Sequence, residues 1–434
     1  MIIGIVVTRS HLVRAKALAQ SIKRFNPEVK VVVSLLERYN MQDISMYPHF
    51  DEVVLASQTW LGDFNQAIFK YNAREASSFS RALLIDYLFN RYPNENQIVL
   101  LDSDMEVLAP LQDLRSRLEE CSILLTPRHL RTGAESDDTR VGVYNAGLVG
   151  VSRTPSGLAF AQWWMQRLER YSFLEYDDET KKLLAEQKWL NQVPVLFDGV
   201  QVLKHAGYNV ADWNYDERDI TQNGGSHYLA NGETLYIKHY HRVEDQEKEA
   251  SQPEYASKRP VLAALIKQYV ERLDALGWDR TYSMPWSYQF FASGEPIQDS
   301  TRMLYRNNLF LEQEYPNPYE LSNEFFEWGM FGEVPPVIQS QAEPMTRSVQ
   351  PGVLTLFDVP RRKMLPHHRI TKKGKKSRSI RKRSRSRSSD SLVKSIREAK
   401  DSSVKKQWTW SFSHRRAAPL LIHSAKLRRR AGSR

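Results

Sequence analysis

Two carboxylates one residue apart, Asp102 and Asp104, are the side chains of this sequence best placed to do chemistry. They directly follow the apolar run 98–101, which has the composition of a buried strand. Two carboxylates at the end of such a strand cannot both be buried without a counter-charge. Mn²⁺ or Mg²⁺ would supply one, because both ions favour hard oxygen ligands, including the oxygens of a diphosphate. The pair therefore predicts a metal site that neutralises a departing nucleoside diphosphate, with an ordinary surface turn as the alternative.

His239 is a second candidate for this metal site, because it ends a strand-like stretch that begins with the apolar residues 235–237. A neutral imidazole is a good ligand for Mn²⁺ and is compatible with two aspartates around the same ion. His241 follows two residues later, so the choice between the two histidines stays open. The alternative is a pair of surface histidines beside Lys238.

Two further groups have the chemistry to contact a sugar or a phosphate. Asn145 precedes Ala146 and Gly147, where small residues would let a sugar ring approach the backbone and the amide could bind hydroxyl groups. Arg81 lies on a predicted helix, and its guanidinium could form paired hydrogen bonds with a phosphate. The alternatives are a glycine-containing turn at 145–147 and a charged helix surface at Arg81.

The elements that must position these side chains alternate between strand and helix over residues 1–110. Strands are predicted at 2–7, 29–36, 52–56 and 97–101, and helices at 11–25 and 74–91. The alternation favours a parallel sheet with helices on both of its faces. Ligands of such sheets bind at the carboxyl ends of the strands, which is where Asp102 and Asp104 would lie.

The remaining chain is predicted to form three parts. Both element types continue to residue 245, which defines an α/β domain at 1–245. Helices are predicted at 111–121, 156–171 and 179–192, and strands at 122–126, 141–151 and 235–239. Residues 246–335 form a mainly helical accessory segment, because 258–275 has a helical pattern and 281–332 has shorter ones. Residues 336–434 are predicted to be a linker and a disordered basic tail, because so few apolar groups cannot offset the entropy of ordering.

Charge is distributed unevenly along the chain. Residues 361–434 carry 26 Lys and Arg against three acidic residues, a net charge of +23, whereas the rest carries −13. The single cysteine, Cys121, excludes a disulfide framework within the chain and a cysteine-based zinc site. Residues 1–8 predict a buried strand rather than a signal peptide, and the sequence has no apolar run of ~18–20 residues. We therefore expect a cytoplasmic protein, which the basic tail could attach to the inner face of the membrane.

Several motifs, in chain order, resemble the GT-A glycosyltransferases, and among them the glycogenin-like and lipopolysaccharide galactosyltransferase-like retaining enzymes. The motifs are Val7-Thr8, Ser80-Arg81, Asp102-Ser103-Asp104, Tyr144-Asn145-Ala146-Gly147, Glu186-Gln187-Lys188-Trp189-Leu190-Asn191, Asp212-Trp213-Asn214 and Lys238-His239-Tyr240-His241. The resemblance covers roughly residues 1–245. Two positions depart from the family pattern: Glu186 stands where aspartate is usual, and Arg242 stands near a family glycine.

The resemblance implies an α/β fold with a GT-A-like (Rossmann-like) mixed sheet flanked by helices. It implies a hexosyltransferase-like enzyme that moves a sugar from a nucleotide-diphosphate donor, a UDP-sugar, with retention of configuration. Mn²⁺ or Mg²⁺ would be bound by Asp102, Asp104 and His239. Glu186 and Gln187 would be catalytic, beside the reacting carbon of the donor sugar, with a plain helix surface as their alternative. The implied donor-binding residues are Thr8, Arg81, Asp102, Ser103, Asp104, Asn145, Ala146, Gly147, Asp212 and Asn214.

Other functions and partners stay open at this point. A sugar-nucleotide nucleotidyltransferase shares the β-α-β start, but a glycine-rich loop would be expected after its first strand, and residues 8–11 contain no glycine. A non-catalytic protein could bind RNA through the Arg-Ser pairs at 383–388, or an anionic membrane through Trp408 and Trp410 among basic residues. The acceptor of the sugar, whether a glycan, a lipid-linked molecule or a protein, is not specified by the sequence.

Overall fold

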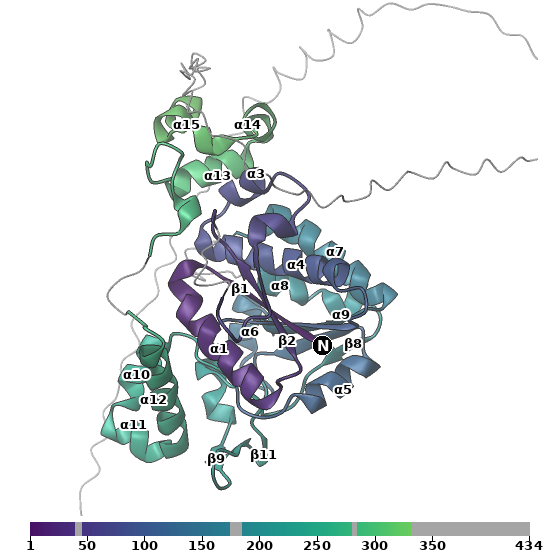
Figure 1. Ribbon diagram of the computed structural model, residues 1–434, viewed down its shortest axis with the longest axis vertical. Helices are drawn as coiled ribbons and strands as arrows, with labels where there is room; N and C mark the ends of the chain where they lie inside the picture. Colours follow the sequence, from purple (N-terminus) through teal and green to yellow (C-terminus); the bar gives the residue numbers. More distant parts are fainter. Residues whose placement is uncertain (40–45, 174–184, 280–283, 331–434) are drawn as a thin grey trace, which may run out of the picture. The chain divides into compact units, whose positions relative to one another are not determined.

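A seven-stranded mixed sheet organises the computed structural model, which describes residues 1–39, 46–173, 185–279 and 284–330 (Figure 1). In spatial order, the strands are β3 (Glu52–Leu55), β2 (Lys30–Leu35), β1 (Ile2–Val7), β4 (Gln97–Leu101), β7 (Tyr144–Ser152), β6 (Ile123–Pro127) and β8 (Val200–Val202). The first four are parallel to one another, whereas β7 runs antiparallel to both β4 and β6. The predicted α/β class with a mixed sheet is confirmed, and β7 is the strand that departs from the parallel pattern expected from the β-α-β alternation.

Helices cover both faces of this sheet (Figure 1). They are α1 (Leu12–Phe25) and α5 (Gln112–Glu120) on one face, and α4 (Ala73–Arg91) and α7 (Pro155–Tyr171) on the other. Successive residues of β1 serve the two faces in turn: Ile2 packs in one cluster with Phe79 of α4, and Ile3 in a second with Leu18 of α1. Burial on both sides explains why β1 is apolar throughout.

The start of α4 is fixed by its cap, and this matters because α4 carries Arg81. The side chain of Asn72 accepts hydrogen bonds from the backbone N–H groups of Arg74 and Glu75, both at 3.1 Å. Glu75 in turn accepts from the backbone N–H of Asn72 at 3.0 Å. This reciprocal capping box satisfies backbone donors that have no partner within the helix.

A second, smaller layer brings the end of the predicted α/β domain back to the sheet. The strand β5 (Met105–Val107), which follows Asp104, pairs antiparallel with β12 (Ile237–His239). Three helices, α10 (Val243–Ala250), α11 (Pro253–Lys258) and α12 (Pro260–Ala275), pack beside it, with the rings of Tyr240 and Tyr269 stacked at 3.7 Å. A short sheet of β9 (Ile220–Gln222), β10 (Tyr228–Ala230) and β11 (Glu233–Thr234) adjoins them. The sequence did not predict β9–β11 or α10.

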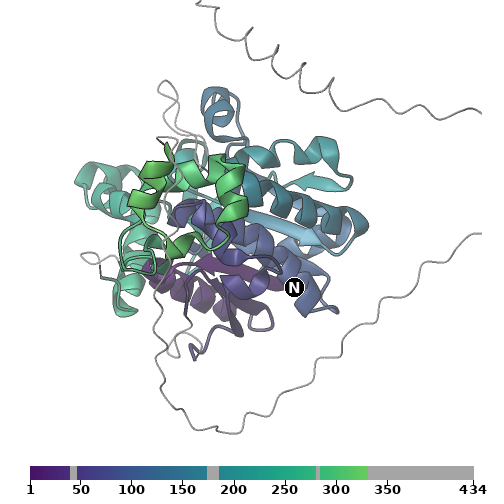
Figure 2. The ribbon, with the colours of Figure 1, turned by 90° about the horizontal axis from the view of Figure 1, so that it is seen from above.

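The C-terminal extension is helical, as predicted. It contains η4 (Ser287–Gln289), α13 (Asp299–Asn307), α14 (Leu309–Glu314), η5 (Pro318–Glu320) and α15 (Asn323–Met330). In Figure 2 the green helices of this segment overlie the purple and blue N-terminal elements, and they share a hydrophobic cluster with α3 (Phe64–Phe69) and α4. The domain boundaries at residues 245 and 335 stay predictions.

One carboxylate ties this extension to the loop after β1. The two side-chain oxygens of Glu37 accept hydrogen bonds from the backbone N–H groups of Arg9, at 2.9 Å, and of Ser287, at 3.0 Å. The indole N–H of Trp286 donates to the carbonyl of Leu36 at 2.9 Å. The guanidinium of Arg38 lies over the ring of Tyr319 at 4.2 Å. The extension is therefore anchored at the carboxyl end of β2.

The remaining short elements connect these layers. They are η1 (Arg9–His11), η2 (Ala56–Thr59), α6 (Glu135–Val141), α8 (Ala185–Leu190), α9 (Val193–Leu196) and η3 (Asp212–Glu217). The first part of the helix predicted at 179–192, and the basic tail predicted at 336–434, lie outside the described residues. Within the described ranges, no helix has the length and apolar character needed to cross a bilayer.

Candidate active site

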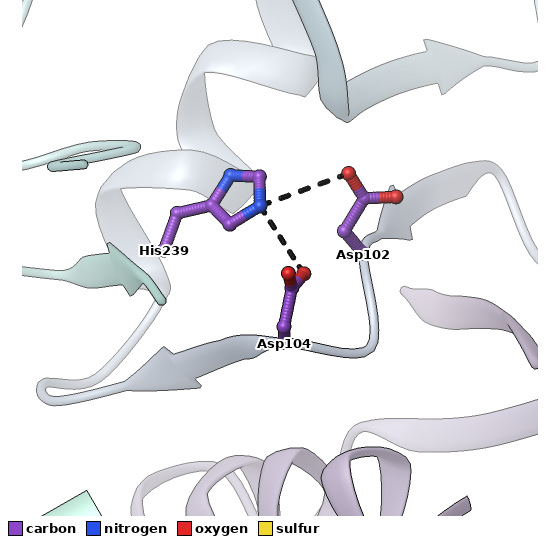
Figure 3. A group of neighbouring side chains, drawn as sticks. All are labelled: Asp102, Asp104 and His239. Carbon is purple, nitrogen blue, oxygen red and sulfur yellow. Dashed lines mark ion pairs between the residues drawn. The ribbon is translucent and has the colours of Figure 1, made fainter. Parts of the chain in front are cut away.

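Asp102, Asp104 and His239 meet at the end of β4, and we call them the carboxylate–histidine cluster (Figure 3). Nε2 of His239 lies 3.1 Å from Oδ1 of Asp104 and 3.9 Å from Oδ2 of Asp102. One ligand atom from each residue lies within 4.8 Å of the others. Two carboxylate oxygens and one imidazole nitrogen are a suitable donor set for Mn²⁺.

The pairing of β12 with β5 positions His239 beside the two aspartates. His239 stands opposite Met105, and the backbone N–H of Tyr240 donates to the carbonyl of Asp104 at 2.8 Å. Trp213 packs edge-on against the imidazole, with ring centroids 5.2 Å apart. Of the two histidines considered from the sequence, the structure brings His239 to the aspartates, whereas His241 pairs with Asp212.

The charges of the cluster are strongly coupled. Burial alone would raise the pKa of Asp104, but the adjacent His239 and the guanidinium of Arg14 hold it well below its usual range. Burial alone would lower the pKa of His239, but Asp104 and Asp102 raise it above the ordinary value of 6.5. The surroundings of the cluster thus favour a positive charge between the two aspartates.

Arg81 reaches the cluster from α4 and holds Asp102. Its guanidinium pairs with Oδ1 of Asp102 and donates to the backbone carbonyl of Ala146. Gly147 leaves the space that this arrangement needs, because a Cβ there would lie 2.7 Å from Oδ2 of Asp102 and 2.6 Å from the side-chain oxygen of Asn145. The small residues of the Asn-Ala-Gly motif therefore let the backbone approach the carboxylate closely.

Three buried amide side chains, Asn145, Gln187 and Asn209, lie behind the cluster, and we call them the amide chain. Nδ2 of Asn145 donates to Oε1 of Gln187 at 3.0 Å, and Nδ2 of Asn209 donates to Oδ1 of Asn145 at 3.1 Å. Oδ1 of Asn209 lies 3.0 Å from Nδ1 of His239. The chain ends at the backbone of Val141, whose carbonyl accepts from Nε2 of Gln187 at 2.9 Å.

Asp212 and Arg242 form an ion pair at the rim of the site. The carboxylate of Asp212 lies 3.3 Å from Nδ1 of His241 and 2.7 Å from the guanidinium of Arg242. Burial alone would raise the pKa of Asp212, but these two partners lower it to about 2. Arg242 adopts a left-handed backbone, with φ +51° and ψ +52°, at the position near which the family has glycine.

A cavity of about 1410 Å³ opens over these groups. The predicted site residues that line it are Thr8, Arg81, Asp102, Ser103, Asp104, Asn145, Ala146, Gly147, Glu186, Gln187, Asp212 and His239. Trp286 of the C-terminal extension lines it as well. Charged and polar side chains from several elements converge in this cavity, which makes it the candidate ligand-binding site.

Asn214 is the one predicted site residue outside the set that lines this cavity. Its buried amide donates to the backbone carbonyls of Arg128 and Asn209, both at 3.1 Å, and accepts from the N–H of Ala211 at 2.9 Å. The side chain therefore holds the backbone around Asn209 in place.

Asn209 itself was missed by the sequence analysis. It has a positive φ of 52° and is fully buried. The only local signal is that asparagine tolerates this conformation better than most residues, which does not distinguish a site from a turn.

No family model matches the chain. Two proteins of Bacillus subtilis, both described as uncharacterized, are similar in sequence. YfnF is 20% identical over 254 residues, which is 54% of this chain and 79% of YfnF. YfnD is 24% identical over 143 residues, which is 33% of this chain and 46% of YfnD.

Several solved structures similar to this chain are glycosyltransferases. The galactosyltransferase LgtC, in complex with donor and acceptor sugar analogs, is 15% identical with a TM-score of 0.39, covering 65% of this chain and 98% of LgtC. The glycosyltransferase GlyE of Streptococcus pneumoniae TIGR4 is 15% identical with a TM-score of 0.35, covering 67% of this chain and 66% of GlyE.

Proposed function

We propose that this protein is a metal-dependent glycosyltransferase that moves a sugar from a nucleotide-diphosphate donor to an acceptor. The observation that carries the proposal is the carboxylate–histidine cluster in the wall of the cavity, at the carboxyl end of β4. Binding of ligands at strand ends is the rule for open α/β sheets.

The residues present fit a divalent ion. Asp102, Asp104 and His239 offer ligand atoms within 4.8 Å of one another. The imidazole nitrogen favours Mn²⁺ over Mg²⁺, which prefers an all-oxygen shell. When bound, such an ion supplies positive charge that stabilises the diphosphate as it leaves the sugar.

The side chains around the cluster have separate tasks in this proposal. Arg81 holds the carboxylate of Asp102 by pairing with Oδ1, and Oδ2, the oxygen nearer His239, would be left for the ion. Thr8, beside β1, and Ser103 contact the donor nucleotide. Glu186 and Gln187 line the cavity and stabilise the positive charge that develops at the sugar carbon. The proposal also includes a UDP-sugar as the donor and transfer with retention of configuration.

A thermal-shift screen of nucleotide sugars, with and without Mn²⁺, tests this function. A donor at ~100 times its Kd stabilises the native state by about 2.7 kcal/mol, so its melting shift is easily measured. We expect UDP-sugars to raise Tm only with the ion, and the Asp104→Asn variant to lose the effect. A shift with nucleoside triphosphates and sugar phosphates instead would favour the nucleotidyltransferase. No shift with any nucleotide and ion would overturn the proposal.

The basic segment carries a separate part of the proposal. Its net charge of +23 over residues 361–434 supports binding to an anionic membrane or to RNA. The acceptor of the sugar in this proposal is a glycan, a lipid-linked molecule or a protein. Peripheral attachment at the inner face of the membrane would follow from the first of these partners. Binding to anionic vesicles and to RNA at low and high salt separates the two, and failure of both would discard this role.

A further inference from the structure

The amide chain has only one direction in which all of its hydrogen bonds can form. The carbonyl of Val141 can only accept, so the nitrogen of the Gln187 side chain faces it and the oxygen faces Asn145. That oxygen must then receive N–H groups, which come from Nδ2 of Asn145 at 3.0 Å and the backbone of Ala146 at 3.4 Å.

The same logic continues to the histidine. Oδ1 of Asn145 accepts a hydrogen bond from the backbone N–H of Gly147 at 3.1 Å, so this atom is the oxygen of the amide. It can therefore only accept a hydrogen bond from the Asn209 side chain. Nδ2 of Asn209 is thereby the donor at 3.1 Å, which leaves Oδ1 of Asn209 facing Nδ1 of His239 at 3.0 Å. An oxygen there requires a proton on Nδ1.

Reversal of any one amide would bring two donors or two acceptors face to face inside the protein. Asn209 is fully buried, and Gln187 and His239 are each 3% exposed, so water cannot compensate for the lost bonds. Backbone groups of three residues, Val141, Ala146 and Gly147, anchor the direction independently of one another.

We propose that Asn209, held by Asn145 and Gln187, is a positioning residue that fixes His239 with its proton on Nδ1. Nε2 then presents its lone pair to the space shared with Asp102 and Asp104, as a metal ligand must. Gln187 thereby acts on the cluster through two other side chains, in addition to lining the cavity. This inference rests on the proposed metal-binding function.

The test replaces Asn209 with glycine, because its φ of 52° suits glycine and the backbone conformation is kept. Asn231→Gly is the matched control: Asn231 has φ 53°, its side chain makes two hydrogen bonds, to the backbone of Asp219 and Glu217, and it lies in the exposed turn before β11. Melting curves verify that both variants are folded. Loss of such a support typically weakens metal binding by ~10–100-fold, so we expect Asn209→Gly to raise the Kd for Mn²⁺ by this factor and Asn231→Gly to leave it unchanged.

Nitrogen NMR of histidine-labelled full-length protein supplies a readout that a general loss of stability would not alter. Spectra are recorded where the ring is neutral, with and without Mg²⁺, and the His239 signal is assigned by its absence in His239→Gln. We expect the proton on Nδ1 in the wild type and a mixture of the two tautomers in Asn209→Gly.

Two results would overturn the inference: a wild type with its proton on Nε2, or an Asn209→Gly variant with unchanged tautomer and Mn²⁺ affinity. A wild type that has the expected tautomer but binds neither Mn²⁺ nor Mg²⁺ would instead overturn the proposed function.

Discussion

The carboxylate–histidine cluster and the amide chain are neighbours that differ in charge and in burial. The cluster gathers charge, and its aspartates stay partly accessible, with side-chain exposures of 31% for Asp102 and 16% for Asp104. The amide chain is neutral and buried, and it holds the histidine by hydrogen bonds alone. Charges that face a ligand need access to it, whereas neutral amides can be buried at little cost when every bond is made. The chemistry and its support are therefore divided between different residue types.

The largest expected effect comes from removing one charge of the cluster. Asp104→Asn keeps the size of the side chain but halves the negative charge that faces His239. We expect Mn²⁺ binding to weaken by more than the ~10–100-fold typical of a supporting residue, measured by the paramagnetic resonance of free Mn²⁺. Asp113→Asn is the control, since Asp113 pairs with Arg117 and Tyr208 instead. Equal affinity in the two variants would discard the metal role of Asp104.

The Gln187→Ala variant tests whether the amide chain takes part in the chemistry itself. If Gln187 also stabilises the sugar carbon in the transition state, kcat should fall roughly 100-fold while donor affinity changes little. If it acts only by holding Asn145, the loss should appear as weaker Mn²⁺ binding that excess metal restores. Steady-state kinetics at low and saturating Mn²⁺ separate these outcomes, and unchanged kinetics would return Gln187 to a plain structural role.

The rim residue Asp212 gives a prediction about pH. Its pKa is lowered from 3.8 to about 2, so its stabilising effect is present above pH ~4 and is lost as the pH falls through ~2. The shift corresponds to about 2 kcal/mol at neutral pH. Urea unfolding of Asp212→Asn should show this deficit at pH 7 and roughly half of it at pH 3. A deficit independent of pH would mean that packing, and not charge, explains the effect.

Arg242 allows backbone and charge to be separated at the same rim. Both Arg242→Gly and Arg242→Ala remove the guanidinium that pairs with Asp212, but only glycine tolerates the left-handed backbone without strain. The glycine variant should therefore be more stable than the alanine variant by about 1 kcal/mol. Thermal or chemical unfolding measures this difference directly, and equal stabilities would show that the backbone there relaxes freely.

The smallest expected effect is on catalysis after removal of the basic segment. A protein that ends at Ile338 keeps every residue that lines the cavity. Its turnover on a small soluble acceptor should equal that of the full chain, whereas binding to anionic vesicles or RNA should be lost. Loss of turnover in a folded truncated protein would place part of the catalytic unit beyond residue 338.

Much of the sheet was predictable because its strands are continuous apolar runs, and Asp102 and Asp104 were found because they directly follow one of them. The pairing of β5 with β12 was not predictable from the sequence, because it joins segments about 130 residues apart and no local pattern indicates such a contact. The strands β9–β11 have only two or three residues each, too few for a periodic signal. Asn209 became visible only once the fold placed it between His239 and Asn145.

Glu37 links the C-terminal extension to the loop that borders the cavity. One buried carboxylate is shared between the loop that follows β1 and the start of η4, although Glu37 and Ser287 are 250 residues apart in sequence. Two segments that share a hydrogen-bonding partner form a coupled equilibrium, and such coupling is reciprocal. If a ligand beside Thr8 stabilises this arrangement of the loop, it also stabilises the docking of residues 284–330, and by the same free energy.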